Sequence, residues 1–282
     1  MKIGIVGLGL IGGCLGLDFK AAGHTVYGVA RREHTCEKAL TAEAVDVAST
    51  RLATLNGCDV VFVCTPIATI VPMVSELAGV LSPEVIVTDV GSVKAALVEA
   101  ATAQWPMFVG GHPMSGKSEA GIEAAETGLF QGNSYVITPV ETATLKTDKG
   151  AITTLETLAK QLGSRLYHCS PEVHDRAVAW ISHLPVMVST SLIQSVINEP
   201  DNSVQQLAQA LASSGFRDTS RVGGGNPELG LMMAQYNRKE VLRSLKRYQQ
   251  EIALTIEQIE AEDWPAVRQK LEATKAVRSK FL

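Results

Sequence analysis

The chain has 282 residues, of which 46% are hydrophobic, and a formal net charge of −4 at pH 7. This composition is typical of a globular protein, and the length favours about two domains. The slightly acidic balance argues against nucleic-acid binding. Apolar stretches are interrupted before the ~18–20 residues that a membrane span needs, and the glycine-rich N-terminus argues against a signal peptide. Five cysteines without C-x-x-C spacing indicate reduced thiols, a cytoplasmic protein and no structural metal site.

Short apolar runs rich in β-branched residues alternate with helical patterns through the first part of the chain. These runs are Ile3–Gly7, Thr25–Val29, Val60–Cys64, Val85–Val90, Met107–Val109, Tyr135–Thr138 and Arg165–His168. Runs such as VVFVC are apolar throughout, which is typical of strands buried on both faces of a parallel sheet. We therefore predict an α/β Rossmann-type domain with a doubly wound, mostly parallel sheet over residues 1–168.

The pattern changes after the Ser-Pro-Glu sequence at residues 170–172. No strand is predicted from there on, and apolar residues recur at spacings of three and four, as in residues 241–264. Leu242, Leu245, Ile252 and Ile256 lie on one side of that expected helix. We predict an all-α substrate and dimerisation domain over residues 169–282, with a homodimer formed through its helices.

A glycine-rich turn follows the first predicted strand. Gly7, Gly9 and Gly12 form G-x-G-x-x-G, with Leu10 and Ile11 between the last two, directly before a predicted helix. The first glycine permits a tight turn, the second lets the backbone approach a pyrophosphate, and the third lets the helix lie close to the strand. This context predicts a dinucleotide site at the helix N-terminus.

The end of the second predicted strand bears on which dinucleotide is bound. An NAD site usually has a carboxylate there for the ribose 2′-hydroxyl. Here Arg31 and Arg32 follow Ala30, and Glu33 comes only after these two cations. Guanidinium groups suit a 2′-phosphate, so we predict NADP; a pair of solvated surface arginines is the alternative.

Two further strand ends lie at the edge of the sheet where ligands bind. Cys64, Thr65 and Pro66 follow the third long strand, where we expect them to lie under the nicotinamide ribose, with Cys64 as a small apolar residue rather than a nucleophile. Gly91 and Ser92 follow the next strand. Ser92 is either a cap of a helix beginning at Val93, a substrate contact, or both.

The stretch GGHPMSGKSEAG follows another predicted strand and contains His112. Because the carboxyl ends of neighbouring parallel strands converge, we expect Ser92 and His112 to face one nicotinamide. Removal of hydride from an alcohol needs a base for the hydroxyl proton. A histidine, with an unperturbed pKa near 6.5, is suited to that task.

The segments GLGLIGG, DVGSVK, GGHPMSGKSEAG, SHLP and GFRDTSRV occur in this order, and together they resemble the prephenate/arogenate dehydrogenase family of tyrosine biosynthesis. The resemblance extends from Lys2 to at least Glu228. It implies that His112 takes the proton of the ring 4-hydroxyl while hydride passes to the nicotinamide, and that Ser92 hydrogen-bonds this histidine and the hydroxyl region. The glycines before the histidine, including Gly111, then give clearance for substrate and cofactor. No metal is implied.

The resemblance also assigns substrate contacts to the helical half. Arg221 in the D-x-x-R pattern is the main carboxylate-binding residue, with Asp218 beside it and Arg217 as a further candidate. His183, in SHLP, is a candidate for the cleft. For His174 we favour a structural role, and the roles of Lys117 and Glu119 stay open.

Two departures from the family pattern concern the substrate. Many prephenate-using members read SHLPH, whereas this chain has Val186 at the last position. They often have an acidic residue six positions beyond the catalytic histidine, where this chain has Ser118, followed by Glu119. Replacing a potentially cationic histidine by valine removes repulsion against the ammonium group of arogenate, so the sequence favours arogenate.

Prephenate dehydrogenase and a dual-specificity cyclohexadienyl dehydrogenase are the alternative functions. A β-hydroxyacid dehydrogenase is a further alternative, because residues 223–226 read GGGN, but no suitably placed lysine follows before Arg238. A non-catalytic NADP-binding protein is the last alternative. The joint presence of His112, Ser92 and Arg221 argues against it.

Overall fold

The structure is a computed structural model that describes residues 1–117 and 119–281. Its centre is an eight-stranded sheet with strand order β3-β2-β1-β4-β5-β6-β7-β8. All neighbouring strands are parallel except β6 and β7, which are antiparallel. The strand order reverses between β1 and β4, as in dinucleotide-binding folds. The predicted fold class, a Rossmann-type sheet followed by helices, is confirmed.

The strands are β1 (Lys2–Val6), β2 (Thr25–Val29), β3 (Val47–Ser49), β4 (Val60–Val63), β5 (Ile86–Asp89), β6 (Phe108–Pro113), β7 (Ser134–Thr138) and β8 (Arg165–His168). The three-residue β3 was not predicted. Strand β6 is longer than predicted, because Gly110 to Pro113 continue it by pairing with β7, where His112 lies opposite Val136. The histidine therefore lies on a strand and not on a loop.

The α-helices are α1 (Leu10–Ala21), α2 (Glu33–Thr41), α3 (Ile67–Leu77), α4 (Val98–Gln104), α5 (Lys149–Gln161), α6 (Pro171–Val178), α7 (Leu184–Ile197), α8 (Asn202–Leu211), α9 (Ser214–Ser220), α10 (Pro227–Tyr236), α11 (Arg238–Glu260) and α12 (Trp264–Val277). The short helices are η1 (Leu52–Leu55), η2 (Ile122–Ala124), η3 (Ala179–His183), η4 (Arg221–Gly224) and η5 (Arg278–Phe281). No strand occurs after His168 within the described part of the chain.

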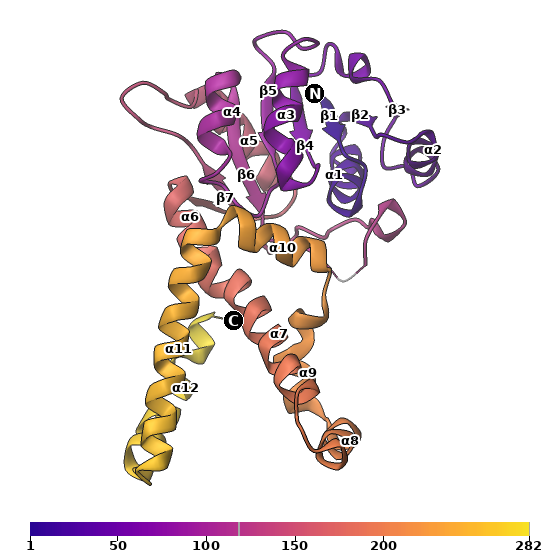
Figure 1. Cartoon of the computed structure of the whole chain (residues 1–282). Helices are drawn as coiled ribbons and strands as arrows, with labels where there is room; N and C mark the ends of the chain where they lie inside the picture. Colours follow the sequence, from indigo (N-terminus) through magenta and orange to yellow (C-terminus); the bar gives the residue numbers. More distant parts are fainter. Residues whose placement is uncertain (118, 282) are drawn as a thin grey trace. The chain divides into compact units, whose positions relative to one another are not determined.

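Successive side chains of the central strands enter two separate cores. On β4, Val60 and Phe62 belong to a core with residues of α1 and α5, whereas Val61 and Val63 belong to a core with residues of α3 and α4. This alternation follows from the two-residue period of a strand. Helices therefore cover both faces of the sheet (Figure 1), which explains why β4 is apolar at every position.

Helices α6, η3 and α7 form one continuous helical run, Pro171–Ile197. Ser170 caps its start by accepting a hydrogen bond from the Val173 N–H. The segment η3 is a π-helical turn, in which the Leu184 N–H donates to the Ala179 carbonyl five residues earlier. The wide turn lies directly before Pro185, whose missing N–H and bulky ring would disturb a regular α-helix at this point.

By length and composition alone this run of 27 residues, which contains an 18-residue window with a mean hydropathy of 1.2, is long and apolar enough to cross a membrane. It is longer than the apolar stretches expected from the sequence because Pro185 does not end it. Its polar residues His174, Asp175 and His183 are nevertheless buried inside the protein and hydrogen-bonded there. The run therefore carries the interior polar groups of a folded unit.

The chain divides into two compact units, Met1–Asn237 and Arg238–Leu282. The first contains the sheet and helices α1 to α10. The second contains α11 and α12, and several large apolar side chains of α11 are exposed, among them Leu242, Ile252 and Ile256. The predicted division at residues 168 and 169, into a dinucleotide domain and a helical domain, stays a prediction.

Candidate active site

The glycine-rich turn between β1 and α1 has the geometry that a dinucleotide requires. Gly7 has a φ of +101°, and a Cβ atom there would lie 2.7 Å from the Cys64 carbonyl oxygen. A Cβ on Gly12 would lie 2.1 Å from the Gly7 carbonyl oxygen, so only glycine lets α1 start so close to the turn. A Cβ on Gly9 would meet nothing within 4 Å, which leaves open space before the N-terminus of α1. Leu10 and Ile11 form the first turn of this helix.

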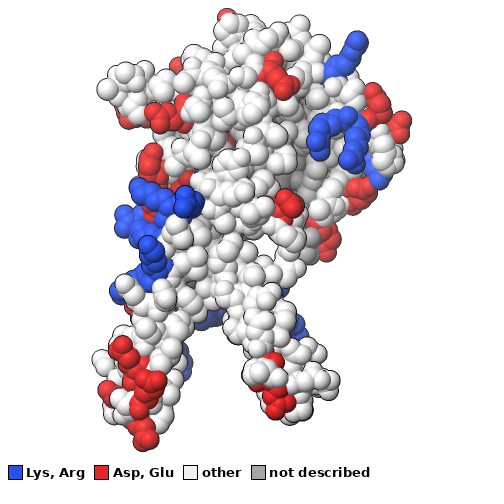
Figure 2. All heavy atoms as spheres, viewed as in Figure 1, with Lys and Arg blue, Asp and Glu red and all other residues white. Residues whose placement is uncertain are grey.

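The end of β2 carries two exposed arginines. Ala30 is buried, whereas Arg31 and Arg32 are exposed, and neither forms an ion pair with any residue that the structure describes. Arg32 stands at the N-cap of α2, and Glu33 accepts a hydrogen bond from Thr50. Figure 2 shows lysine and arginine side chains gathered beside α2. The arginines are thus free to meet an anionic ligand at this edge.

The end of β4 lies directly beside the glycine turn. The backbone of Cys64 and Thr65 forms the wall that a Cβ on Gly7 would strike. Burial raises the pKa of the Cys64 thiol far above its usual range, with the nearby Asp89 carboxylate adding to the effect. A thiol held protonated in this way is a poor nucleophile. Pro66 follows as the N-cap of α3.

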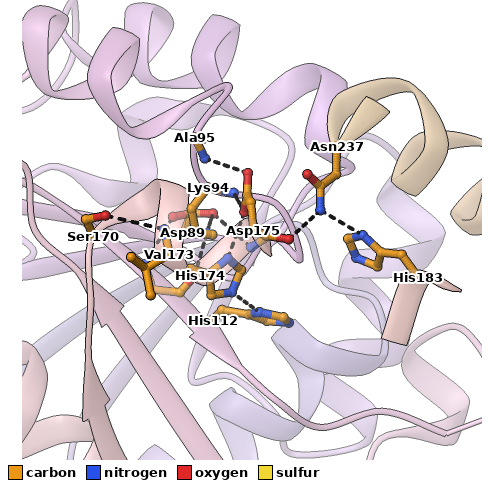
Figure 3. A network of polar contacts seen from close by, with 12 residues as sticks. Asp89, Lys94, Ala95, His112, Ser170, Val173, His174, Asp175, His183 and Asn237 are labelled. Atoms are coloured by element: carbon orange, nitrogen blue, oxygen red, sulfur yellow. Dashed lines mark hydrogen bonds and ion pairs between the residues drawn. The ribbon is translucent and has the colours of Figure 1, made fainter. Parts of the chain in front are cut away.

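A chain of hydrogen bonds links His112 on β6 to helix α6 (Figure 3). Nδ1 of His112 lies 2.8 Å from Nε2 of His174, and Nδ1 of His174 lies 2.8 Å from Oδ1 of Asp175. The two rings meet nearly edge to face, at 67°. All three residues are buried, with His112 9% and both other residues 2% exposed.

The Asp175 carboxylate also accepts two backbone N–H groups from the segment after β5. Oδ1 accepts from Lys94 at 2.7 Å, and Oδ2 accepts from Ala95 at 2.9 Å. The segment is therefore held by a side chain 80 residues away and not by a local cap. The expected helix beginning at Val93 is wrong, since α4 begins only at Val98.

Ser92, the candidate cap and catalytic residue, has no hydrogen bond to its Oγ among the residues described, although this atom is buried. No hydrogen bond joins Ser92 to His112 among the described contacts, although the family resemblance implied one; Nδ1 of the histidine is bonded to His174 instead. An orphaned buried hydroxyl leaves hydrogen-bonding capacity for a ligand. Gly91, just before it, donates its N–H to Asp89 at 2.8 Å.

Behind the histidines lies a fully buried ion pair between Lys94 and Asp89. The Lys94 ammonium also donates to the Gly111 carbonyl at 2.6 Å, and the Gly111 N–H donates to Asp89 at 3.2 Å. A Cβ on Gly111 would lie 2.8 Å from the Asp89 carbonyl oxygen. Strands β5 and β6 are thereby joined through side chains directly before His112.

His183, at the end of the π-helical turn, belongs to the same cluster. The amide nitrogen of Asn237 donates to the Asp175 carbonyl at 2.8 Å and lies 3.1 Å from Nδ1 of His183. A nitrogen that donates both of its hydrogens leaves Nδ1 as the acceptor, so the ring carries its proton on Nε2. This Nε2 is buried and has no partner within the described residues.

The environment holds both site histidines in their neutral forms. Burial lowers the pKa of His112 well below its usual value, and the neighbouring His174, Lys94 and His183 lower it further. Burial likewise lowers the pKa of His183 to about 4. A neutral histidine can accept a proton at neutral pH, which a histidinium cannot.

The arginines of GFRDTSR lie on α9 and η4. Arg217 and Asp218 are exposed and form a pair at 3.3 Å, with 74% and 72% of their side chains exposed. Arg221 is exposed as well and starts η4. η4 packs tightly against α7, because a Cβ on Gly223 would lie 2.6 Å from the backbone of Ser189.

Lys117 and Asn226, two other candidates from the sequence, have local partners. Lys117 forms an ion pair with Glu126 at 3.1 Å. Asn226, from the GGGN sequence, caps α10 by accepting from the Glu228 N–H at 3.0 Å. Ser118 lies outside the described residues.

His174, Asp175 and Asn237 complete the buried cluster, yet the sequence indicated a structural role for the first and no role for the other two. An adjacent His-Asp pair in the first turn of a helix was the available signal. Its partner His112 lies 62 residues away in the chain, so only the fold shows the contact.

A Rossmann-type sheet, a glycine turn open for a pyrophosphate and a buried neutral histidine at the same edge define a dinucleotide-dependent dehydrogenase. Residues 15–168 match the sequence model "Prephenate dehydrogenase, nucleotide-binding domain", and residues 170–273 match "Prephenate dehydrogenase, dimerization domain". The chain belongs to the prephenate dehydrogenase family.

Similar proteins agree with this assignment. The crystal structure of Synechocystis arogenate dehydrogenase has a TM-score of 0.90, with 48% identity over 100% of both chains. Prephenate dehydrogenase from A. aeolicus, in complex with hydroxyphenyl propionate and NAD+, has a TM-score of 0.93 with 26% identity, covering 100% of this chain and 98% of the other. Prephenate dehydrogenase of Bacillus subtilis is 31% identical over 92% of this chain and 70% of its own length.

Proposed function

We propose that the protein is an NADP-dependent arogenate dehydrogenase, which converts L-arogenate to L-tyrosine, carbon dioxide and NADPH. The observation that carries the proposal is the buried His112 at the sheet edge, held neutral and hydrogen-bonded through Nδ1 so that Nε2 is left for a substrate hydroxyl. The cofactor, when bound, accepts the hydride from the ring carbon that carries the hydroxyl.

In the proposed reaction, Nε2 of His112 accepts the hydroxyl proton, and the ring becomes a dienone. The bond between the ring and its carboxylate then breaks, carbon dioxide leaves, and the electron pair makes the ring aromatic. The resulting phenolate takes the proton back from His112, which restores the neutral histidine. The orphaned Ser92 hydroxyl is a second polar group available to the same substrate oxygen.

The proposal of NADP depends on the end of β2. The turn around Gly7, Gly9 and Gly12 suits the pyrophosphate of any dinucleotide, so it does not distinguish NADP from NAD. Arg31 and Arg32 are exposed, form no ion pair with a described residue and follow the end of β2, the part of a dinucleotide-binding fold that recognises the ribose 2′ substituent. Forked hydrogen bonds from a guanidinium group suit a phosphate.

A matched variant series tests the cofactor. We expect Arg31→Ala and Arg32→Ala each to raise the KM for NADP+ by about 10-fold or more, the value of one charge-assisted hydrogen bond, and to leave the KM for NAD+ unchanged. Arg165→Ala, an exposed arginine on β8, is the control and should change neither. An equal effect on both cofactors would contradict the assignment of these arginines to the phosphate.

The proposal of arogenate depends on the helical part of the site. Nε2–H of His183 and the arginines Arg217 and Arg221 are donors suited to carboxylates. Val186, one turn after His183, adds no charge that would repel the ammonium group by which arogenate differs from prephenate. Synechocystis arogenate dehydrogenase, 48% identical, supports the same choice.

Steady-state kinetics with arogenate and prephenate, each with NADP+ and NAD+, test the proposal. We expect the highest kcat/KM for arogenate with NADP+. A higher kcat/KM for prephenate would overturn the substrate assignment and leave the dehydrogenase chemistry intact. We expect Val186→His to shift the ratio toward prephenate, and Val188→His, two residues further along α7, to serve as its control.

We also propose a cytoplasmic homodimer formed through the helices of residues 170–273, the segment that matches a dimerization domain. The exposed apolar side chains of α8 (Val204, Leu207 and Leu211) and those of α11 are surfaces that a second copy would cover. Light scattering should then give twice the 30.0 kDa of one chain. A mass of one chain at micromolar concentration would contradict the dimer.

A further inference from the structure

We propose that His174 and Asp175 are positioning residues that fix His112 in one tautomer, with the proton on Nδ1 and the lone pair on Nε2. This inference rests on the proposed function, in which Nε2 of His112 accepts the substrate proton. It assigns a role to the two residues of α6 that the reaction itself does not consume.

The Asp175 carboxylate accepts three N–H groups. They are the backbone N–H of Lys94 and of Ala95, at 2.7 and 2.9 Å, and Nδ1 of His174 at 2.8 Å. An ionised carboxylate has acceptors only. Nδ1 of His174 must therefore carry a hydrogen, whatever the charge of the ring.

A neutral imidazole carries one N–H group and one nitrogen lone pair. With its hydrogen on Nδ1, neutral His174 has a lone pair on Nε2. That atom lies 2.8 Å from Nδ1 of His112, so Nδ1 of His112 must be the donor. The neutral His112 ring then has its lone pair on Nε2, the atom needed for proton transfer from the substrate.

No other group in the described part of the chain competes for the hydrogen bonds that fix the hydrogen positions of His174 and His112. The His174 side chain is 1% and the Asp175 side chain 3% exposed, so water does not compete at either group. Lys94 and His183 are the other cationic or titratable groups that act on His112, and neither forms a hydrogen bond with it among the described contacts. His174 is thus the group that sets the tautomer.

The arrangement also explains how the two parts of the site are held together. The same Asp175 carboxylate binds the backbone after β5 and orients the histidine of α6 that contacts β6. Placement of the proton acceptor is therefore tied to placement of the segment that carries Ser92. Asp175 orients His174, and His174 in turn orients His112, as the aspartate of a catalytic triad orients the histidine base.

Two-bond ¹H–¹⁵N spectra of ¹⁵N-histidine-labelled protein at pH 8 measure the tautomers directly. The chain has six histidines, and His112→Asn and His174→Gln assign the two signals of interest. We expect both rings to be neutral with the hydrogen on Nδ1. Finding His112 with its hydrogen on Nε2 would overturn the proposal, and this readout does not depend on turnover.

Three variants test the consequence for catalysis. Asp175→Ala removes the acceptor that keeps the hydrogen on Nδ1 of His174, so we expect neither ring to keep a single tautomer and kcat to fall by about 10²–10⁴-fold, with KM within about threefold. His174→Leu removes the acceptor and should also lower kcat. His174→Gln keeps an acceptor near Nε2 and should retain most of the activity.

A matched pair on the surface serves as the control. His168 and Glu156 form a His–carboxylate pair at 3.1 Å that is 41% and 29% exposed and belongs to β8 and α5. His168→Leu and Glu156→Gln should leave kcat unchanged. Thermal unfolding and cofactor binding of every variant show whether it is folded.

The outcomes separate the two hypotheses. Equal losses in His174→Leu and His174→Gln, with unchanged ¹⁵N shifts of His112, would overturn the positioning role. Full activity of His112→Asn would instead overturn the proposed function, while the tautomer measurement would still stand. A loss in His174→Leu that His174→Gln restores, together with mixed tautomers in Asp175→Ala, supports the proposal.

Discussion

The buried cluster around His112 and the exposed arginines at the ligand edge are organised in opposite ways. In the cluster, Asp89, Lys94, His174, Asp175 and Asn237 are all buried and hydrogen-bonded to one another or to backbone. Arg31, Arg32 and Arg221 are exposed and form no ion pair with described residues. The groups proposed for chemistry are thus fixed before the substrate arrives, whereas those proposed for recognition receive their partners from the ligands.

The comparison predicts its largest effect at His112. His112→Asn removes the proton acceptor, so we expect kcat to fall by about 10²–10⁴-fold, the usual contribution of general base catalysis. Cofactor affinity, measured by fluorescence titration, should be unchanged because the glycine turn is untouched. Retention of turnover would show that the buried cluster is structural and would remove the distinction between the two regions.

The next largest effect is expected on stability, at the buried ion pair. Lys94→Met leaves Asp89 charged and buried without its cation, which should lower the free energy of unfolding by about 3–5 kcal/mol. Lys146→Met is the control, because the Lys146–Glu141 pair is 57% and 75% exposed and should be worth less than about 1 kcal/mol. Denaturant titrations measure both changes. Similar losses of unfolding free energy in the two variants would contradict the prediction that the buried ion pair matters more than the exposed one.

The exposed arginines should affect binding and leave stability unchanged. We expect Arg221→Ala to raise the KM for arogenate by about 10–100-fold, since a hydrogen bond between charged groups contributes about 1.5–3 kcal/mol. Arg217→Ala should have a smaller effect, because Asp218 already engages its guanidinium group. If kcat fell and KM did not change, Arg221 would act in the chemical step and not in substrate binding.

The smallest expected effect is the pH dependence of stability. The folded-state pKa of His183 is lowered to about 4, below the ~6.5 of an unfolded chain, so the unfolded state binds more protons between these values. The contribution of His183 to the free energy of unfolding is then fully present above pH ~6.5 and is lost as the pH falls toward 4. We expect about 1 kcal/mol less free energy of unfolding at pH 5.5 than at pH 7 from this residue, and a flatter profile in His183→Gln.

The elements that depend on local sequence were predicted well. The glycine turn after β1 follows from the spacing of Gly7, Gly9 and Gly12, and the central strands follow from continuous β-branched runs. The three-residue β3 has too few residues to produce such a signal. The extension of β6 through His112 depends on pairing with β7, which no local pattern of the strand reveals.

Long-range contacts account for the other differences. The segment after β5 contains helix-forming residues, but its Lys94 and Ala95 N–H groups are bound by Asp175, so the helix starts later. His174 resembled an ordinary helix histidine because its partner is on another element. The sequence therefore identified His112 as a candidate for catalysis, but only the fold shows the hydrogen bonds that fix where its hydrogen lies.

The π-helical turn Ala179–His183 has a geometric consequence for the whole site. In a regular α-helix, residues nine positions apart, such as His174 and His183, lie about two and a half turns apart and so point to opposite sides. The wide turn has the effect of one additional residue, which rotates the later part of the helix back by about 100°. Both histidines can then be buried in one cluster. Because the π-helical turn accommodates one additional residue, deleting one residue within 179–183 would leave a regular α-helix whose later side chains keep their present orientation. A one-residue deletion inside α7, beyond this turn, would instead rotate the side chains that follow it by about 100°.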